Sequence, residues 1–404
     1  MNKFFLFFLS VSILLSSIAS LAQNDYKTIS GYVLDKETNE PIVFASIYLK
    51  GQGIGTTSNN EGYFRFHIPS HREVNTIVIS IIGYESLEKN ANDFIANQNI
   101  YLNSTTTSLD EVVITSTKEK ELTAKQIIKK AYQEIKNNYP SEPYILEGFV
   151  RDLQKEDEAY VAYLECATKF LYKGITTRKE PEVELLAVRT NYLAPQHPWN
   201  ENSERKNSII DLVEDEFIRF DYGPIKGKSS WKYEIEDIVP YQNGMVYQIE
   251  GTDKPFQNAT LYIDTETFAF IKIELTRQPK NNRYWRDRFT NGAQQASYHV
   301  IFEYQEYKGK MYLKYQKEED AWIIYDGLTS KKVLFTKYPK KELFINKIIT
   351  DNVASYPFKR NMDISASIEN QSETDHPDFW NSYNIPQQTE AQSKILKELK
   401  NRTD

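Results

Sequence analysis

The sequence has one cysteine, Cys166, and only five histidines among its 404 residues. A single cysteine excludes an intrachain disulfide bond. Cys166 stands in a mixed apolar run without a Cys/His motif around it, so we interpret it as a small buried residue and not as a catalytic thiol. His67 and His71 are the closest histidine pair, and Pro69 between them breaks the helix that a zinc-binding pair at this spacing needs. The sequence therefore predicts no metal ligands and no cofactor.

Other signatures of catalysis and of nucleic-acid binding are also missing. The chain has no Gly-x-Ser-x-Gly nucleophile elbow. Gly227-Lys-Ser-Ser230 lacks the upstream glycines of a phosphate-binding loop. The 49 basic and 56 acidic residues give a formal net charge of −7, and no basic stripe offsets it, so nucleic-acid binding is disfavoured. We predict no catalytic residues.

Long hydrophobic runs are lacking apart from Phe4–Ile18, close to the N-terminus. Lys3 precedes this run, and Ser20-Leu21-Ala22 follows it as a small-x-small cleavage motif. The run is too short for a membrane-spanning helix, so we expect residues 1–22 to be a signal peptide; an uncleaved anchor is the alternative. The prediction is an exported protein, periplasmic or associated with the outer membrane, without a transmembrane segment in the mature chain.

Two groups of carboxylates are the candidates if the protein is instead a hydrolase. Asp264 lies near Glu266, and Glu318 is followed by Glu319 and Asp320. Paired carboxylates can hydrolyse glycosidic bonds. Both groups fall at predicted strand ends beside turns, where solvated carboxylates are normal.

Tyrosine, in contrast, is abundant, with 28 copies. Tyrosine suits strands and half-buried surfaces, because its ring packs while its hydroxyl reaches a polar partner. The composition favours β-structure with sugar, peptide or lipid-like contacts, although ordinary strand-facing tyrosines explain most of it.

Residues 28–103 show short apolar segments separated by turn residues. Asn59-Asn-Glu-Gly62 is a tight turn in which glycine accepts a positive φ. Five to seven short strands at this spacing predict an all-β sandwich. The clearest predicted strands are 29–35, 43–49, 63–68, 76–82 and 99–102.

Four motifs in order make residues 28–116 resemble the carboxypeptidase-like regulatory domain. The resemblance implies an immunoglobulin- or transthyretin-like sandwich that often precedes an outer-membrane module in exported proteins of Gram-negative bacteria. It implies no peptidase activity, because this module is an accessory domain. The motifs are Gly31-Tyr-Val-Leu-Asp, Glu40-Pro-Ile-Val-Phe-Ala, Gly55-Thr-Thr-Ser-Asn-Asn-Glu-Gly-Tyr-Phe and Ile82-Gly-Tyr84.

Residues 104–122 are predicted to be a connector. Within it, Leu109–Thr115 contains three consecutive β-branched residues and predicts an extended strand. This segment resembles the connector that leads into the plug of TonB-dependent transporters. The likeness to transporters stops after residue 117, because fewer than 300 residues remain and they lack the strand series of a closed barrel.

Residues 123–364 predict an α+β domain. Thr123 and Gln126 form a capping box for a helix with an apolar stripe, and strands dominate from Trp231 onward. Residues 174–207 are expected to be a long loop with a short helix near 182–191, and 208–220 a second helix. The strand pattern resembles the half-closed sheet wrapped on a helix of periplasmic lipoprotein carriers.

Residues 365–404 form a polar tail, in which 365–388 are expected to be loosely held. Residues 389–402 predict an amphipathic helix with Ile395, Leu396 and Leu399 facing inward. The predicted fold class is thus two-domain: an N-terminal all-β immunoglobulin/transthyretin-like sandwich, and a C-terminal α+β domain with a curved antiparallel sheet packed on a helix.

Aromatic residues of the predicted sheet are the candidate ligand-binding residues. Tyr298, Phe302 and Tyr304 share one strand face, Trp322 follows the partner strand, and Trp285 precedes the hairpin. If the sheet curls, this face could accept an acyl chain or a sugar. If the sheet packs tightly on the helix at 123–138, the same rings are core.

The sequence favours a non-enzymatic binding or assembly protein of the cell envelope. In this hypothesis the sandwich docks on an envelope or outer-membrane protein, and the C-terminal domain holds a partner, a glycan or a lipid-like ligand. A hydrolase that uses the paired carboxylates on glycans or peptides is the alternative, and a purely structural spacer is the third interpretation.

Overall fold

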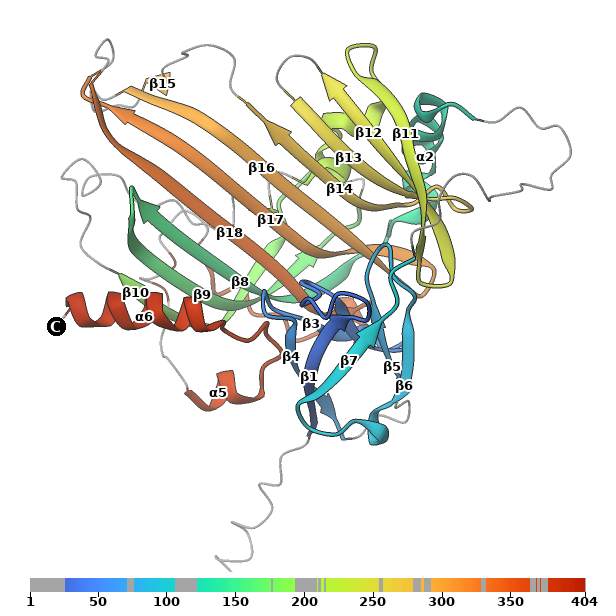
Figure 1. The fold of residues 1–404 in the computed structure, drawn as a ribbon, viewed down its shortest axis with the longest axis horizontal. Coiled ribbons are helices and arrows are strands. Elements are labelled where there is room, and N and C mark those ends of the chain that lie inside the picture. The colour runs from blue at the N-terminus through green and yellow to red at the C-terminus, as the bar shows by residue number, and fades with distance from the viewer. Residues whose placement is uncertain are drawn as a thin grey trace, which may run out of the picture.

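The computed structural model is dominated by β-strands (Figure 1). The predicted signal peptide, the central strand of the predicted connector and His71 lie outside the residues that the structure describes. The described residues are 26–70, 76–105, 122–175, 177–192, 209, 212–213, 216–253, 257–278, 285–286, 292–327, 332–363, 368, 371 and 377–403.

Two sheets form the N-terminal part of the described chain. One has the strand order β4-β1-β7, and the other contains β3-β2-β5-β6. Apolar side chains from both sheets, among them Val33, Ile47, Phe64 and Ile79, are buried in one cluster, as expected for a sandwich. The strands are β1 (Tyr26–Asp35), β2 (Ser46–Leu49), β3 (Ile54–Thr57), β4 (Tyr63–Pro69), β5 (Thr76–Ser80), β6 (Leu87–Asn90) and β7 (Gln98–Leu102).

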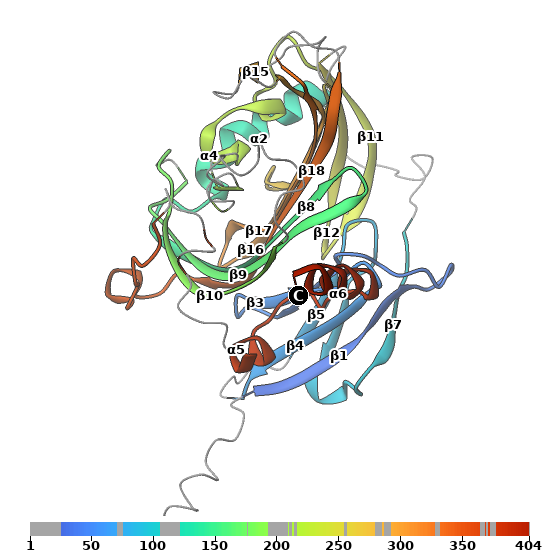
Figure 2. The same cartoon turned by 90° about the vertical axis from the view of Figure 1, so that its left-hand side faces the viewer.

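The rest of the chain builds a curled antiparallel sheet (Figures 1 and 2). Its strand order is β11-β12-β13-β14-β16-β17-β18-β8-β9-β10, with β15 paired to β16. The curved antiparallel sheet predicted for this part is therefore confirmed. Its strands are β8 (Tyr144–Glu156), β9 (Ala159–Tyr172), β10 (Glu182–Tyr192), β11 (Lys232–Tyr241), β12 (Gly244–Asp253), β13 (Gln257–Asp264), β14 (Phe270–Arg277), β15 (Trp285–Arg286), β16 (Gly292–Tyr307), β17 (Lys310–Tyr325) and β18 (Val333–Ile349).

Helices lie inside the curl (Figure 2). Helix α2 (Ala124–Asn138) begins at the predicted capping box, in which Thr123 and Gln126 satisfy each other's backbone N–H groups. Its buried face packs into the core of the sheet. The predicted helix at 208–220 is interrupted, because Glu216 is extended and precedes the short α4 (Phe217–Phe220); the 3-10 turn η4 (Gly223–Lys226) follows.

Long strands are the main departure from the sequence-based expectation. Residues 182–191, expected to form a short helix, are strand β10, because pairing with β9 outweighs the helix propensity of the Glu-Leu-Leu-Ala composition. Strand β18 runs through Pro339, which lies opposite Gln154 of β8. The β16–β17 hairpin turns at Lys308 and Gly309, both at positive φ, and both strands extend well past the predicted ends.

The C-terminal segment packs on the outer, convex side of the curled sheet (Figure 2). Residues 365–388 were expected to be loosely held, and this is wrong for the described part. Trp380 and Tyr383, in and after α5 (Pro377–Ser382), are buried against Phe149. Helix α6 (Glu390–Thr403) forms where the sequence predicts a helix, and Ile395 and Leu399 pack beside Tyr163.

The same segment ties the sandwich to the curled sheet. The side-chain amide of Asn384 accepts a hydrogen bond from the N–H of His67 at 2.7 Å and donates one to its carbonyl at 3.0 Å. The amide of Asn346 in β18 donates to the carbonyl of Asn384 at 2.8 Å. Asn384 therefore binds the backbone of His67 at the edge of β4 and links this strand to β18 through Asn346.

Direct contacts also join the sandwich to the curled sheet. The N–H of Ile348 donates to the carbonyl of Gly53 at 2.7 Å, and β3 and β18 are neighbours in one sheet. The ring of Phe44 stacks on Tyr315, with centroids 5.1 Å apart. The two predicted domains thus share one hydrogen-bonded sheet within the described residues.

Candidate functional site on the inner face of the curled sheet

The inner face of the curled sheet is the concave face that packs on α2 and α4 (Figure 2). Successive side chains of a strand point to opposite faces. Tyr298, Phe302 and Tyr304 of β16 belong to the inner core, as their shared strand face predicts. His299 and Glu303 point to the outer face. The inner face divides into two parts of different chemistry.

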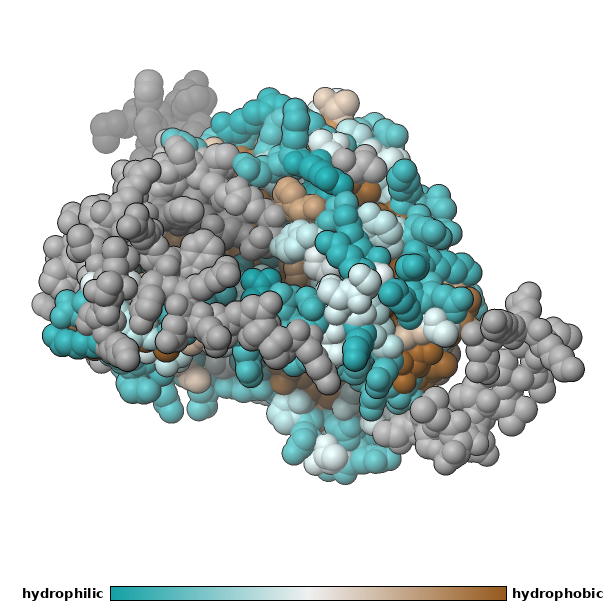
Figure 3. Space-filling view, turned by 90° about the horizontal axis from the view of Figure 1, so that it is seen from above, coloured by the Kyte–Doolittle hydropathy of each residue, from teal (hydrophilic) through white to brown (hydrophobic). Residues whose placement is uncertain are grey.

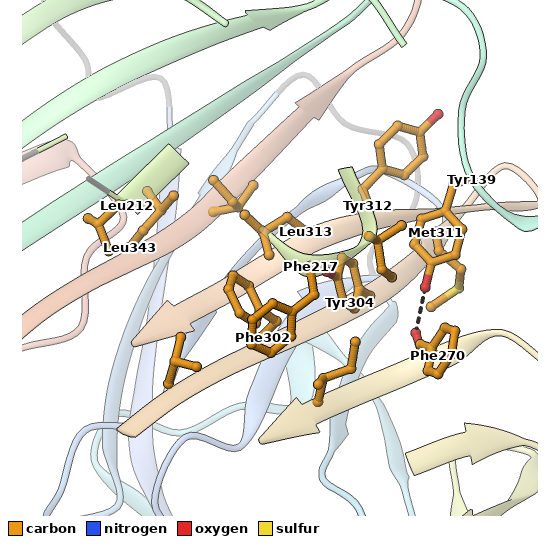
Figure 4. Packing of buried hydrophobic residues seen from close by; sticks show 14 of the residues in the cluster. Tyr139, Leu212, Phe217, Phe270, Phe302, Tyr304, Met311, Tyr312, Leu313 and Leu343 are labelled. Atoms are coloured by element: carbon orange, nitrogen blue, oxygen red, sulfur yellow. Dashed lines mark hydrogen bonds between the residues drawn. The ribbon is translucent and has the colours of Figure 1, made fainter. Parts of the chain in front are cut away.

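The first part, here called the apolar half, surrounds Phe302 and Tyr304 (Figure 4). The ring of Phe302 contacts Phe217 of α4 at 4.9 Å between centroids, and Tyr304 meets Tyr139 edge-on at 5.4 Å. The hydroxyl of Tyr139 donates to the carbonyl of Phe270 at 3.0 Å. Side chains of the chain itself therefore fill this half.

A buried ion pair holds α4 in the apolar half. The Nε of Arg219, whose residue is only 2% exposed, lies 3.2 Å from a carboxylate oxygen of Glu216. Its Nη2 donates to the hydroxyl of Tyr144 at 3.1 Å, and its guanidinium lies 4.1 Å from the ring centre of Tyr172. Burial raises the pKa of both tyrosines, so they remain neutral. Arg219 thus has an ion-pair partner, a hydrogen-bond acceptor and an aromatic ring around its guanidinium group, an arrangement typical of a permanent structural contact.

The second part, here called the polar half, follows from the strand registers. Glu318 is opposite Val300 and Lys341, and Lys341 is opposite Asp152. Residues opposite each other in a sheet share a face. The same argument places the remaining members inward. Seen from above, hydrophilic residues make up much of the described outer surface of the molecule (Figure 3). The polar half comprises Asp152, Glu156, Gln295, Glu318, Asp320, Trp322, Lys337 and Lys341.

Asp320 has the most distinctive electrostatics of the polar half. Burial raises its pKa, while side-chain hydrogen bonds with Gln295, at 2.7 Å, and with Glu318 and Trp322 oppose that rise. Two acidic groups in hydrogen-bonding contact cannot both ionise at low cost. Burial therefore makes ionisation of Asp320 less favourable than ionisation of an exposed carboxyl group, and this carboxyl lies next to the indole ring of Trp322.

The sequence-based grouping of Glu318, Glu319 and Asp320 is wrong in two respects. These residues lie in the middle of β17 and not at a strand end. Glu319 also points to the outer face, where Lys317 at 3.0 Å and Lys340 at 3.4 Å pair with it. The three carboxylates therefore do not form one cluster.

The proximity of Asp264 and Glu266 is explained by a turn. Asp264 ends β13, and its Oδ1 accepts the N–H groups of Glu266 at 3.1 Å and Thr267 at 2.7 Å. A side-chain acceptor of this kind stabilises a turn. This pair belongs to the β13–β14 turn, away from the polar half.

The predicted ligand-binding residues are thus split between the two halves. Phe302 and Tyr304 lie in the apolar half, and Trp322 lies half-buried in the polar half. Tyr298 lies between the halves, opposite Asp320, with the guanidinium of Arg277 at 5.1 Å from its ring centre. Trp285 is in β15, opposite Ala293, beyond the polar half; its side chain is outside the described residues.

Sequence reasoning missed Asp152, Glu156, Lys337 and Lys341. The sequence signal for these residues is the alternation of inward and outward side chains along β8 and β18. It can be recognised only when each of these segments is taken as one long strand. Within the described residues, no three His, Cys, Asp or Glu side chains converge in a way that could hold a metal ion.

On the outer face, His299 links β14 and β17. Its Nε2 lies 2.8 Å from a carboxylate oxygen of Glu274, and its Nδ1 lies 3.5 Å from Glu319. Hydrogen bonds with both carboxylates raise the pKa of His299, and the bond to His299 lowers the pKa of Glu274 to about 2. Burial and nearby Lys317 lower the pKa of His299 and so weaken this rise without cancelling it.

This geometry gives a pH-dependent contribution to stability. The folded pKa of His299 exceeds its unfolded value near 6.5, so its contribution is full below that pH and is lost as the pH rises through the folded pKa. We expect His299→Gln to destabilise the protein by about 1 kcal/mol more at acidic than at alkaline pH. Urea unfolding at several pH values measures this difference. A pH-independent difference would contradict the assignment.

Comparison with known proteins finds a family match for the N-terminal part of the chain. Residues 29–114 match the CarboxypepD_reg-like domain family, and this confirms the resemblance that the four sequence motifs carry. The chain is 36% identical over 87 residues to the TonB-dependent receptor SusC of Bacteroides thetaiotaomicron, an alignment that covers 22% of this chain. It covers 8% of the receptor, so the chain spans less than a tenth of that relative.

Two solved structures share a low similarity with the fold. One is a LolA superfamily protein of Nitrosomonas europaea, with a TM-score of 0.22 and 10% identity over 59% of this chain and 98% of the other. The second is a DUF1329 family protein of Desulfovibrio piger, with a TM-score of 0.24 and 10% identity over 57% and 95%. Both TM-scores are low, and no conclusion rests on them. Among the described residues, no helix has the length and apolar character needed to cross a membrane.

Proposed function

We propose that this protein is a non-enzymatic binding or assembly protein of the cell envelope. The sandwich serves as its docking module, and the polar half of the curled sheet holds the ligand. The match of residues 29–114 to the CarboxypepD_reg-like domain, and the similarity of this segment to a TonB-dependent receptor, support an envelope location. The apolar run at the N-terminus supports export of the chain.

The observation that carries the proposal is the composition of the polar half. Trp322 offers an aromatic face, and carboxylate, amide and ammonium groups surround it: Asp320, Gln295 and Lys337. Binding sites combine an apolar or aromatic surface with a few convergent polar groups. A hydroxyl-rich ligand such as a glycan fits this combination.

A lipid-like ligand fits less well. An acyl chain needs a continuous apolar lining. In the apolar half that space is taken by Phe217 and Tyr139, packed on Phe302 and Tyr304. A bound acyl chain would have to displace α4 together with the buried Glu216–Arg219 pair. Glycan binding at the polar half requires no such displacement.

Calorimetry of the chain from residue 23 onward against envelope glycans tests the proposal. Trp322→Ala and Asp320→Asn are expected to raise Kd by roughly tenfold or more, because each removes a contact group of the polar half. Tyr338→Ala, an exposed aromatic on β18, is the control and should leave Kd unchanged. Failure of the unaltered chain to bind any envelope glycan, lipid or protein would refute the proposal.

A second candidate function rests on Glu318 and Asp320. They share the inner face, and burial raises the pKa of Asp320, a property expected of a general acid in a glycoside hydrolase. A hydrolase predicts product release from an oligosaccharide panel that both Glu318→Gln and Asp320→Asn abolish. The binding protein predicts saturable binding without turnover.

A further inference from the structure

A cavity of about 200 Å³ lies between the sandwich and the outer face of the curled sheet. The sandwich contributes Phe44 and Ile82 to its wall, and the sheet contributes Ile301. This site is separate from the polar half, because Ile301 points outward from β16. Pockets of this kind at the junction of two units are common ligand sites.

The sandwich holds an unfavourable backbone conformation at this wall. Phe44 has φ of 58°, in the left-handed region that a bulky residue rarely adopts. The conformation directs its ring onto Tyr315, at 5.1 Å between centroids. Strained residues of this kind concentrate at binding sites, where the surrounding structure enforces them.

Three charged side chains form the polar part of the wall. The Nζ of Lys314, a residue only 8% exposed, lies 3.2 Å from Glu303, and Lys272 lies 3.9 Å from the same carboxylate. Lys272 also contacts Glu274 at 3.4 Å, but Glu274 is bonded to His299 as well. Burial lowers the pKa of Lys272, but Glu303 and Glu274 outweigh burial and the net shift is upward, so this ammonium group stays charged. The charged side chains that line the cavity are thus two ammonium groups and one carboxylate, a lining that favours an anion.

We propose that this cavity binds a small amphipathic carboxylate, with its acid group at Lys314 and Lys272 and its apolar part between Phe44, Ile82 and Ile301. A cavity of roughly 150 Å³ accommodates benzene, so this one takes a molecule of about eight to ten non-hydrogen atoms. A medium-chain fatty acid such as octanoate has this size and this division between charged and apolar parts. The inference is independent of the glycan site.

Isothermal titration calorimetry with octanoate, 1-octanol and octylamine tests the proposal on the chain from residue 23 onward. Octanoate is expected to bind at least roughly tenfold more tightly than octanol, and octylamine not to bind. Ile301→Trp, which fills the cavity, should abolish binding. Lys314→Met should weaken octanoate and leave octanol unchanged, because it removes the charge and keeps the apolar stem. Ile235→Trp, at an exposed position on β11, is the control.

Circular dichroism of each variant separates loss of binding from loss of the fold. Lys314→Arg, which keeps the charge, should retain octanoate binding and guards against a folding defect in Lys314→Met. Asp320→Asn should also leave octanoate binding unchanged, which separates this cavity from the polar half. Lack of octanoate binding, equal binding of all three compounds, or binding that survives Ile301→Trp would each overturn the proposal.

Discussion

Glu165→Gln is expected to lower the free energy of unfolding by about 3–5 kcal/mol, because it leaves two guanidinium groups without their buried counter-ion. Glu165 is fully buried; Arg151 donates to it at 2.9 Å and Arg189 at 2.6 Å. The hydroxyl of Tyr163 donates to the same carboxylate at 2.8 Å. Arg151 also donates to the carbonyl of Pro386, so the effect should reach the C-terminal segment. Urea unfolding measures the loss.

The exposed pair Lys50–Glu88 provides the control for this prediction. Its side chains are 52% and 41% exposed, so Lys50→Ala should cost no more than about 1 kcal/mol. Burial raises the pKa of Glu165, but Arg151 and Arg189 outweigh burial and the net shift is downward. The contribution of Glu165 is therefore present above its unfolded pKa and lost as the pH falls through the folded pKa. Equal losses in Glu165→Gln and Lys50→Ala would contradict the ion-pair assignment.

Phe302→Ala is expected to cost about 3–5 kcal/mol, the usual loss when a fully buried phenylalanine leaves a cavity. Phe302 packs against Phe217 in the apolar half, so its removal should destabilise the protein without being specific to ligand binding. Trp322→Ala should show the reverse pattern, with a smaller loss of stability and a large loss of glycan affinity. Thermal unfolding and calorimetry on both variants give the comparison.

This pair of variants also decides between the two interpretations of the aromatic strand face. If Phe302→Ala keeps the stability of the unaltered chain and instead abolishes binding of a long-chain lipid, the apolar half is a ligand cavity and the glycan proposal fails. If stability falls and binding persists, Phe302 is core.

Local sequence signals predicted the parts of the fold that local interactions determine. The Thr123–Gln126 capping box and the apolar stripe after it are sufficient to place α2, because cap and stripe lie within one helix. The strands of the sandwich follow from period-two alternation and from turn residues such as Gly62. The motifs of this part also carried the family resemblance.

The long strands of the curled sheet could not be predicted in this way, because their partners decide their length. Residues 182–192 have a helix-compatible composition and become a strand through pairing with β9. The polar half was hidden for the same reason: Lys341 and Asp152 are far apart in the chain and become neighbours only through the β8–β18 register. Glu319 was grouped with Asp320 by sequence distance, although alternation puts them on opposite faces.

The contact between Asn384 and β4 affects the order in which the chain can mature. More than 300 residues separate His67 from Asn384, so a growing chain completes the sandwich strands long before their capping amide exists. During that interval the backbone N–H and C=O of His67 at the edge of β4 can pair with another chain, which is a known route to aggregation. Protection of this edge therefore depends on one of the last parts of the chain to be made.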